Sequence, residues 1–160
     1  FVVPDCIFPK TGAKIQNLLD PAAKMGKTDD NASGVVFLLD DKDTIMRKFK
    51  RAVTDCDACV KFDKENKPGI SNLLSIYCAA TGKTVAEAEV EFAGQGYGIF
   101  KPAVAESVIE LLRPIREEAE RLTADKAYLE SVYKDGAQKA SYLAEKTLRK
   151  VYKKVGFVAR

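Results

Sequence analysis

Helical periodicity extends from about residue 41 to residue 155 and constrains the fold of this chain more than any other feature. Apolar residues recur there at spacings of three or four, so that they share one face of each predicted helix. Pro68-Gly69 begins one such helix and Gly82 ends it. Thr84-x-x-Glu87 is a capping box that begins the next. The sequence therefore predicts a mainly α fold.

Two prolines and a glycine set the expected ends of the later helices. Pro102 suits a first helical position, and Pro114 should kink or split the long apolar stripe that follows. A helix of about ten residues should precede Gly136, and the last helix should run from about Ala137 to Val155.

The first forty residues have a different pattern. Phe1-Val2-Val3 is typical of the inside of a strand, and Val35–Leu39 is an apolar run that is either a short buried strand or a helix edge. We expect the end of an α/β unit over residues 1–40 and a helical domain over residues 41–160. Since Phe1 is not a start methionine, we also expect the chain to be part of a longer one.

A loop between Asp20 and Asp29 holds two lysines. Pro21 and Gly26 oppose a helix there. Lysines on such a loop suit a polyphosphate whose charge changes during a reaction. Gly26-Lys27-Thr28 is not a P-loop, because Pro21 stands where that motif needs its first glycine.

Composition excludes several kinds of site. The chain has no histidine, which excludes a Ser-His-Asp triad, a Cys-His pair and an H-E-x-x-H zinc site. Cys56-x-x-Cys59 has no second pair, so we expect free thiols in a reducing cytosol and no metal site. No apolar run approaches the roughly 18 residues of a membrane span. We therefore expect a cytoplasmic protein without a membrane partner.

Positive charge is concentrated in two segments, although the net charge is only +3. Between Thr44 and Val53 there are four cations and no acid: Arg47, Lys48, Lys50 and Arg51. A second acid-free segment, from Lys146 to Arg160, carries six cations. Both segments are compatible with a solvated helix face or with contacts to nucleic-acid phosphates.

The loop and the motifs around it together resemble a known family. Lys24-Met25-Gly26-Lys27-Thr28 is similar to the KMSKS signature of class I aminoacyl-tRNA synthetases. Further matching motifs follow in order over nearly the whole chain: Leu18-Leu19-Asp20-Pro21, Leu38-Leu39-Asp40-Asp41, Ala52-Val53-Thr54-Asp55, Lys67-Pro68-Gly69-Ile70-Ser71-Asn72-Leu73-Leu74, Gly96-Tyr97-Gly98-x-Phe100-Lys101 and Leu112-Arg113-Pro114-Ile115. The chain resembles the C-terminal part of the bacterial tryptophanyl-tRNA synthetases, with the tyrosyl enzymes as the nearest alternative.

The resemblance implies a fold and a reaction. The fold would be the tail end of a Rossmann-type nucleotide-binding domain followed by a helical tRNA-binding bundle. The reaction would join tryptophan to its tRNA with ATP and Mg²⁺ in a cytoplasmic homodimer. Lys24 and Lys27 would be catalytic on the ATP phosphates, and the ATP site would also include Ile15, Met25, Gly26 and Thr28. The cations of the first basic segment would contact tRNA: Arg47, Lys48, Lys50 and Arg51.

The chain also departs from the family pattern. Gly26 and Thr28 replace the two serines of the signature, and the cysteine order differs from that of cluster-binding relatives, so we expect no iron–sulfur cluster. The family's His-containing signature cannot exist in a chain without histidine. We therefore expect the chain alone to be inactive. The alternative is a free-standing helical RNA-binding module without catalysis.

Overall fold

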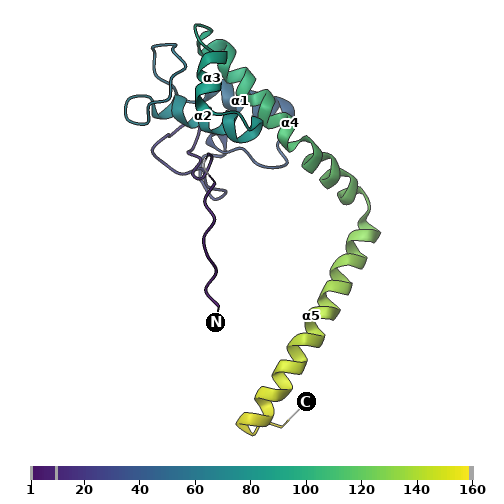
Figure 1. Ribbon diagram of the computed structural model, residues 1–160. Coiled ribbons are helices and arrows are strands. Elements are labelled where there is room, and N and C mark those ends of the chain that lie inside the picture. The colour runs from purple at the N-terminus through teal and green to yellow at the C-terminus, as the bar shows by residue number, and fades with distance from the viewer. Residues whose placement is uncertain (1, 10, 159–160) are drawn as a thin grey trace. The chain divides into compact units, whose positions relative to one another are not determined.

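The computed structural model describes residues 2–9 and 11–158 and is mainly helical (Figure 1). Within these residues a short 3₁₀ helix is followed by five α-helices: η1 (Ala32–Gly34), α1 (Lys42–Arg51), α2 (Pro68–Thr81), α3 (Val85–Glu91), α4 (Gly96–Ala124) and α5 (Lys126–Val155). The predicted mainly α class is confirmed. The chain divides into two compact units, residues 1–116 and 117–160. The boundary expected at residue 40 concerns domains of a longer protein and stays a prediction.

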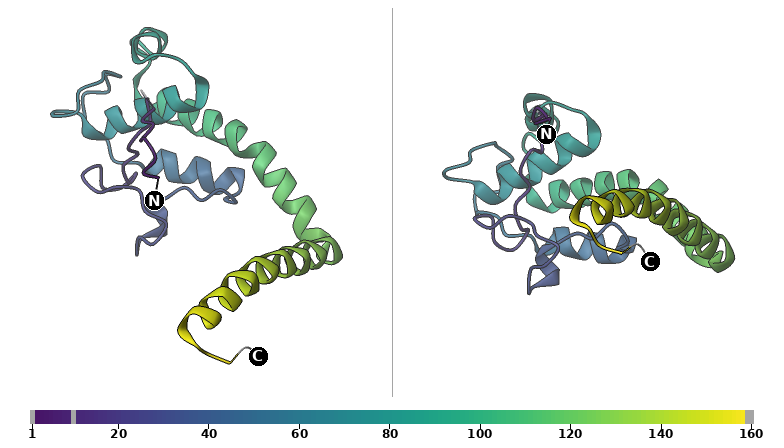
Figure 2. Two further views of the ribbon diagram at one scale, coloured as in Figure 1. Left: turned by 60° about the horizontal axis from the view of Figure 1, so that its bottom comes forward. Right: turned by 90° about the horizontal axis from the view of Figure 1, so that it is seen from below.

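The strand predictions for the first forty residues are wrong. The described residues there contain a single antiparallel bridge, between Gln16 and Lys24, and no arrow is drawn for them in Figures 1 and 2. Val2 and Val3 are exposed, and Phe1 lies outside the described residues. A strand needs a neighbour to satisfy its backbone groups, and the described residues supply only that one bridge.

The hydrophobic core of the first unit combines side chains from α1, α2, α3 and the first part of α4. Three aromatic rings form its centre. Phe92 lies edge-on to Tyr77 and Phe100, with ring centroids 5.3 Å and 4.9 Å apart. Phe100 is fully buried. These contacts connect α2, the end of α3 and the start of α4.

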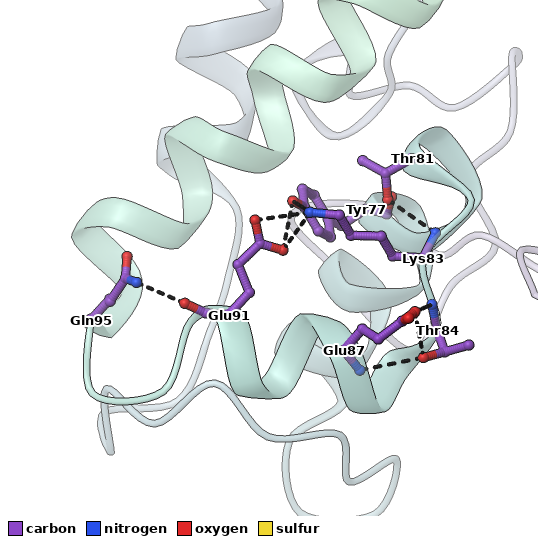
Figure 3. Close-up of polar contacts among 7 residues, drawn as sticks. All are labelled: Tyr77, Thr81, Lys83, Thr84, Glu87, Glu91 and Gln95. Carbon is purple, nitrogen blue, oxygen red and sulfur yellow. Dashed lines mark hydrogen bonds and ion pairs between the residues drawn. The ribbon is translucent and has the colours of Figure 1, made fainter.

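The joint between α2 and α3 forms as the sequence predicts (Figure 3). Gly82 follows α2 in the left-handed conformation, with φ of 75°. Thr84 and Glu87 form the capping box, because each side chain accepts a hydrogen bond from the other residue's backbone N–H. Lys83 pairs with Glu91 at 2.7 Å, and this hydrogen bond raises the pKa of Lys83 and lowers that of Glu91.

Two predicted helix boundaries are wrong, those at Pro102 and Gly136. Helix α4 begins at Gly96 and continues through Pro102, and it is not split at Pro114, where a kink stays a prediction. Buried side chains precede and follow Pro102, and their packing outweighs the roughly 3 kcal/mol that an internal proline costs: Phe100, Val104, Ala105 and Val108. Helix α5 likewise continues through Gly136, where a glycine costs only about 1 kcal/mol.

Candidate functional site

Residues 15–29 form a narrow loop whose two sides are hydrogen-bonded to each other. The Met25 N–H donates to the Ile15 carbonyl at 3.0 Å, and the Asn17 N–H donates to the Ala23 carbonyl at 2.9 Å. A turn closes the far end, where the Ala23 N–H donates to the Asp20 carbonyl at 3.0 Å. The segment is not helical, as Pro21 and Gly26 predict.

Helix α2 holds the base of this loop. The Asn72 amide donates to the Gln16 carbonyl at 2.9 Å and accepts the Gln16 N–H at 2.8 Å. Leu18, buried in the core, accepts the Val53 N–H at 2.8 Å. The first side of the loop is therefore held directly on the first unit, and the second side is held through its hydrogen bonds to the first.

The two lysines of the loop are exposed and unpaired. The Asp29 N–H donates to the Gly26 carbonyl at 3.1 Å, which makes Lys27 and Thr28 the central residues of a tight turn. The ammonium groups of Lys24 and Lys27 have no hydrogen-bond or ion-pair partner within residues 2–9 and 11–158. Two cations on one short segment are thus available to an anionic ligand.

Below the loop lies an apolar cavity of about 190 Å³. Ile15 and Met25 line one side of it, and Phe49, Ile76 and Val108 are among the residues on the others. The structure therefore brings all the predicted ATP-contact residues into one place. They are Ile15, Lys24, Met25, Gly26, Lys27 and Thr28.

The structure separates the four cations predicted to contact tRNA. Arg47, Lys50 and Arg51 are exposed on α1. Lys48 is buried: its Nζ donates to an Asp40 carboxylate oxygen at 2.6 Å and to the Val35 carbonyl at 2.7 Å. The Lys48 ammonium therefore connects α1 to residues 35–40, the segment after the loop. The charge pattern of the sequence had grouped Lys48 with the exposed cations.

Motifs far apart in the sequence meet in a second polar cluster, formed by Asp55, Lys67 and Tyr97. One Asp55 carboxylate oxygen accepts the Tyr97 hydroxyl at 2.5 Å and the Lys67 ammonium at 3.3 Å. Burial alone would raise the pKa of Asp55, but the hydrogen bonds from Tyr97, the Asp57 N–H and Lys67 outweigh it and lower that pKa. Burial, with the hydrogen bond to Asp55, raises the pKa of Tyr97 to about 12.

Neighbouring contacts extend this cluster into a joint between α1, α2 and α4. The Lys101 Nζ donates to the Ala52 carbonyl at 2.9 Å, and burial lowers the pKa of Lys101. Gly69 lies so close to the chain after α1 that an added Cβ would stand 2.2 Å from the Val53 carbonyl oxygen. The cluster orders the segment between α1 and α2, and in the sequence its residues stand out only as parts of family motifs.

The cysteines are free, as predicted. Cys6, Cys56 and Cys59 are exposed, and Cys78 is buried, which raises the pKa of its thiol. Across residues 2–9 and 11–158, no three His, Cys, Asp or Glu side chains are grouped so that they could hold a metal ion. No helix in the described part of the chain combines the length and the apolar character needed to cross a membrane.

Comparison with known proteins identifies the family. The profile described as "tRNA synthetases class I (W and Y)" matches residues 1–113. The chain belongs to this family of class I tRNA synthetases, which includes the tryptophan and tyrosine enzymes.

Two curated relatives carry the same activity name. The chain is 47% identical over 158 residues to a tryptophan–tRNA ligase of Clostridium tetani, covering 99% of this chain and 46% of that protein. It is 47% identical over 156 residues to the tryptophan–tRNA ligase of Oceanobacillus iheyensis, covering 98% and 47%. The chain thus spans about half the length of the curated relatives that it matches.

Solved structures show the same fold. The tryptophanyl-tRNA synthetase of Mycoplasma pneumoniae aligns with a TM-score of 0.69 at 27% identity, over 94% of this chain and 47% of that one. The Campylobacter jejuni enzyme, complexed with ADP and tryptophan, aligns with a TM-score of 0.73 at 24% identity, over 90% and 44%. The helical architecture is therefore that of the matching part of these enzymes.

Proposed function

We propose that this chain is the C-terminal part of a tryptophan–tRNA ligase, an enzyme of the cytoplasm that acts as a homodimer. The carboxylate of tryptophan attacks the α-phosphorus of ATP, the bond to the β-phosphate breaks, and tryptophanyl-adenylate and pyrophosphate form. The tryptophanyl group then passes to its tRNA. The observation that carries the proposal is the loop with two exposed, unpaired lysines, in a chain 47% identical to named tryptophan–tRNA ligases.

Lys27 and Lys24 are proposed to contact the ATP phosphates that leave as pyrophosphate. Negative charge grows on these oxygens as the bond breaks, so a cation there stabilises the transition state more than the ground state. Because neither ammonium is committed to an internal ion pair, neither must give up a partner to bind. One charge-assisted hydrogen bond is worth about 1.5–3 kcal/mol, or roughly 10- to 150-fold in rate.

The other predicted contacts have supporting roles. Thr28 stands beside Lys27 in the tight turn and offers a hydroxyl to the same phosphates. The backbone of Ile15 and the segment Met25-Gly26 would border the nucleotide. ATP would enter with Mg²⁺, whose chemistry is to offset the charge of the phosphates. The chain alone would be inactive, since it has no histidine for the family's other signature.

The test is tryptophan-dependent ATP–pyrophosphate exchange by the complete protein and by the 160-residue chain. We expect exchange from the former only, and a loss of about 10- to 100-fold in its kcat in Lys27→Ala. Lys42→Ala, which removes another exposed lysine, is the matched control. Exchange that depends on tyrosine would contradict tryptophan as the substrate. Exchange by the 160-residue chain alone would contradict the proposal that part of the active site lies outside this chain.

The exposed cations of α1 are proposed to contact tRNA. Each phosphate contact contributes about 0.7–0.9 to the slope of log affinity against log salt. Replacing Arg47, Lys50 and Arg51 by Ala should therefore reduce that slope by about 2–3, measured by tRNA binding to the complete protein. An unchanged slope would favour the solvated-face interpretation. Tight tRNA binding by the isolated chain would instead favour the free-standing RNA-binding module.

A further inference from the structure

An acid lies two residues after Lys27 and yet does not pair with it. One carboxylate oxygen of Asp29, Oδ2, accepts two hydrogen bonds, from the Gly26 N–H at 3.1 Å and from the Asn17 side-chain amide at 3.0 Å. We call Asn17, Gly26 and Asp29 the clasp. It connects the turn that carries Lys27 to the first side of the loop.

The buried Asn17 side chain makes three hydrogen bonds, one of them to Asp29. It is 7% exposed, and its side-chain oxygen accepts the N–H groups of Leu19 and Asp20 at 2.8 Å and 3.3 Å. Its amide nitrogen is thereby turned toward Asp29. The position of the carboxylate is thus set by the first side of the loop, twelve residues earlier in the chain.

Two glycines leave the space that the clasp occupies. A Cβ added at Gly34 would stand 1.9 Å from the side-chain oxygen of Asn17. One added at Gly26 would stand 2.9 Å from the Oδ1 atom of Asp29. The second contact gives a physical reason for a glycine where the family signature has a serine, because a side chain would press against the carboxylate.

We propose that Asp29 is a positioning residue that places Lys27 for its contact with the leaving pyrophosphate, an inference that rests on the proposed function. By bonding to uncharged amides, the carboxylate fixes the turn that carries Lys27 and leaves the lysine ammonium free. Without the clasp the turn would sample many positions, and misplacement by about 1 Å can cost roughly 100-fold in rate. The Asn17 amide supports the same arrangement from the first side of the loop.

The first test measures the turn itself in the 160-residue chain. Asp29→Ala should speed tryptic cleavage after Lys27 and amide exchange at Gly26 by about 10-fold or more, while leaving the helical circular dichroism unchanged. Asp30→Ala is the matched control, since Asp30 is another acid, is exposed and makes no hydrogen bond or ion pair within the described residues. Equal cleavage and exchange rates in the two variants would overturn the proposal.

The second test measures activity of the complete protein. Asp29→Ala should lower kcat of ATP–pyrophosphate exchange by about 10- to 100-fold with little change in KM for tryptophan, and Asp29→Asn, which keeps an acceptor oxygen, should recover part of it. In a Lys27→Ala background, Asp29→Ala should have less than about a 3-fold effect, because its action passes through that lysine.

The outcomes separate the two proposals. Two results in an active protein would overturn the positioning role alone. One is that Asp29→Ala changes kcat no more than Asp30→Ala does. The other is that Asp29→Ala lowers kcat by the same factor in the Lys27→Ala background as in the wild type. A complete protein that lacks tryptophan-dependent exchange overturns the proposed function and, with it, the role of Lys27. In that case the rates of tryptic cleavage after Lys27 and of amide hydrogen exchange at Gly26 still decide whether Asp29 fixes the turn.

Discussion

Replacing Tyr97 by Phe would remove one hydroxyl group from the cluster of Asp55, Lys67 and Tyr97 and leave the ring in place. The hydroxyl donates to an Asp55 carboxylate oxygen at 2.5 Å and lies 3.1 Å from the Cys59 carbonyl. The same carboxylate oxygen keeps the Asp57 N–H at 2.9 Å and the Lys67 ammonium at 3.3 Å. The substitution therefore weakens the cluster without leaving the acid unpaired.

The expected cost follows from these contacts. A hydrogen bond to a charged group contributes about 1.5–3 kcal/mol to stability. Because the Asp55 side chain is 19% exposed and retains other donors, we expect the low end of that range, about 1.5 kcal/mol. The midpoint of thermal unfolding should fall by roughly 4–8 °C for a unit of this size. Urea unfolding of the 160-residue chain at pH 7, followed by circular dichroism, measures both variants.

The pH dependence of the difference is a sharper test. The folded-state pKa of Asp55 is lowered, so its contribution is present above the ordinary pKa of 3.8 and is lost as the pH falls through the lowered value. The folded-state pKa of Tyr97 is raised to about 12, so its contribution is complete below its ordinary value of 10.0 and is lost as the pH rises through about 12. The stability gap between wild type and Tyr97→Phe should be widest between these limits. A gap below about 0.5 kcal/mol at pH 7, or one that stays constant down to pH 3, would refute this account of the cluster.

Two further substitutions test how the loop and its surroundings are built. Lys48→Met should destabilise the chain by about 1.5–3 kcal/mol, because the half-buried Asp40 carboxylate loses its ammonium partner and keeps only the Phe37 N–H. Lys50→Met on the exposed face should change stability by less than about 0.5 kcal/mol, and thermal unfolding compares the two variants. Gly34→Ala should lower the free energy of unfolding by about 2 kcal/mol or more, because its Cβ would collide with Asn17. Gly98→Ala lies in a helix with open space around it and should raise the free energy of unfolding by about 0.5–1 kcal/mol. Thermal unfolding also compares the glycine variants, and equal effects within either pair would contradict the packing described above.

Local signals predicted the helix ends that depend on neighbouring residues alone. Gly82 ends α2 and Thr84 begins α3 because each acts within one turn of its own position. Pro102 misled the prediction of a helix start because long-range packing, which no local pattern contains, extends α4 back to Gly96. The apolar run Val35–Leu39 predicted a strand or a helix edge, but only its first half is covered: Val35 is buried and Val36 packs against the core, whereas Phe37, Leu38 and Leu39 are exposed.

The candidate site was predictable in its residues and not in its contacts. The loop motif identified Lys24 and Lys27, and the structure leaves both available. The burial of Lys48 could not be predicted, because its partners Asp40 and Val35 precede it by eight and thirteen residues on a segment without regular structure. The role of Asp29 was equally hidden, since it depends on an asparagine twelve residues earlier.

The hydrogen bonds between Gln16 and Asn72 have a consequence for the order in which the chain folds. The two residues are 56 positions apart, so the base of the loop cannot form these hydrogen bonds until α2 has been synthesised. At a synthesis rate of about 5–20 residues per second, the loop waits about 3–11 seconds for its partner. The lysines that we propose to act on ATP therefore cannot take their supported positions until α2 has been made.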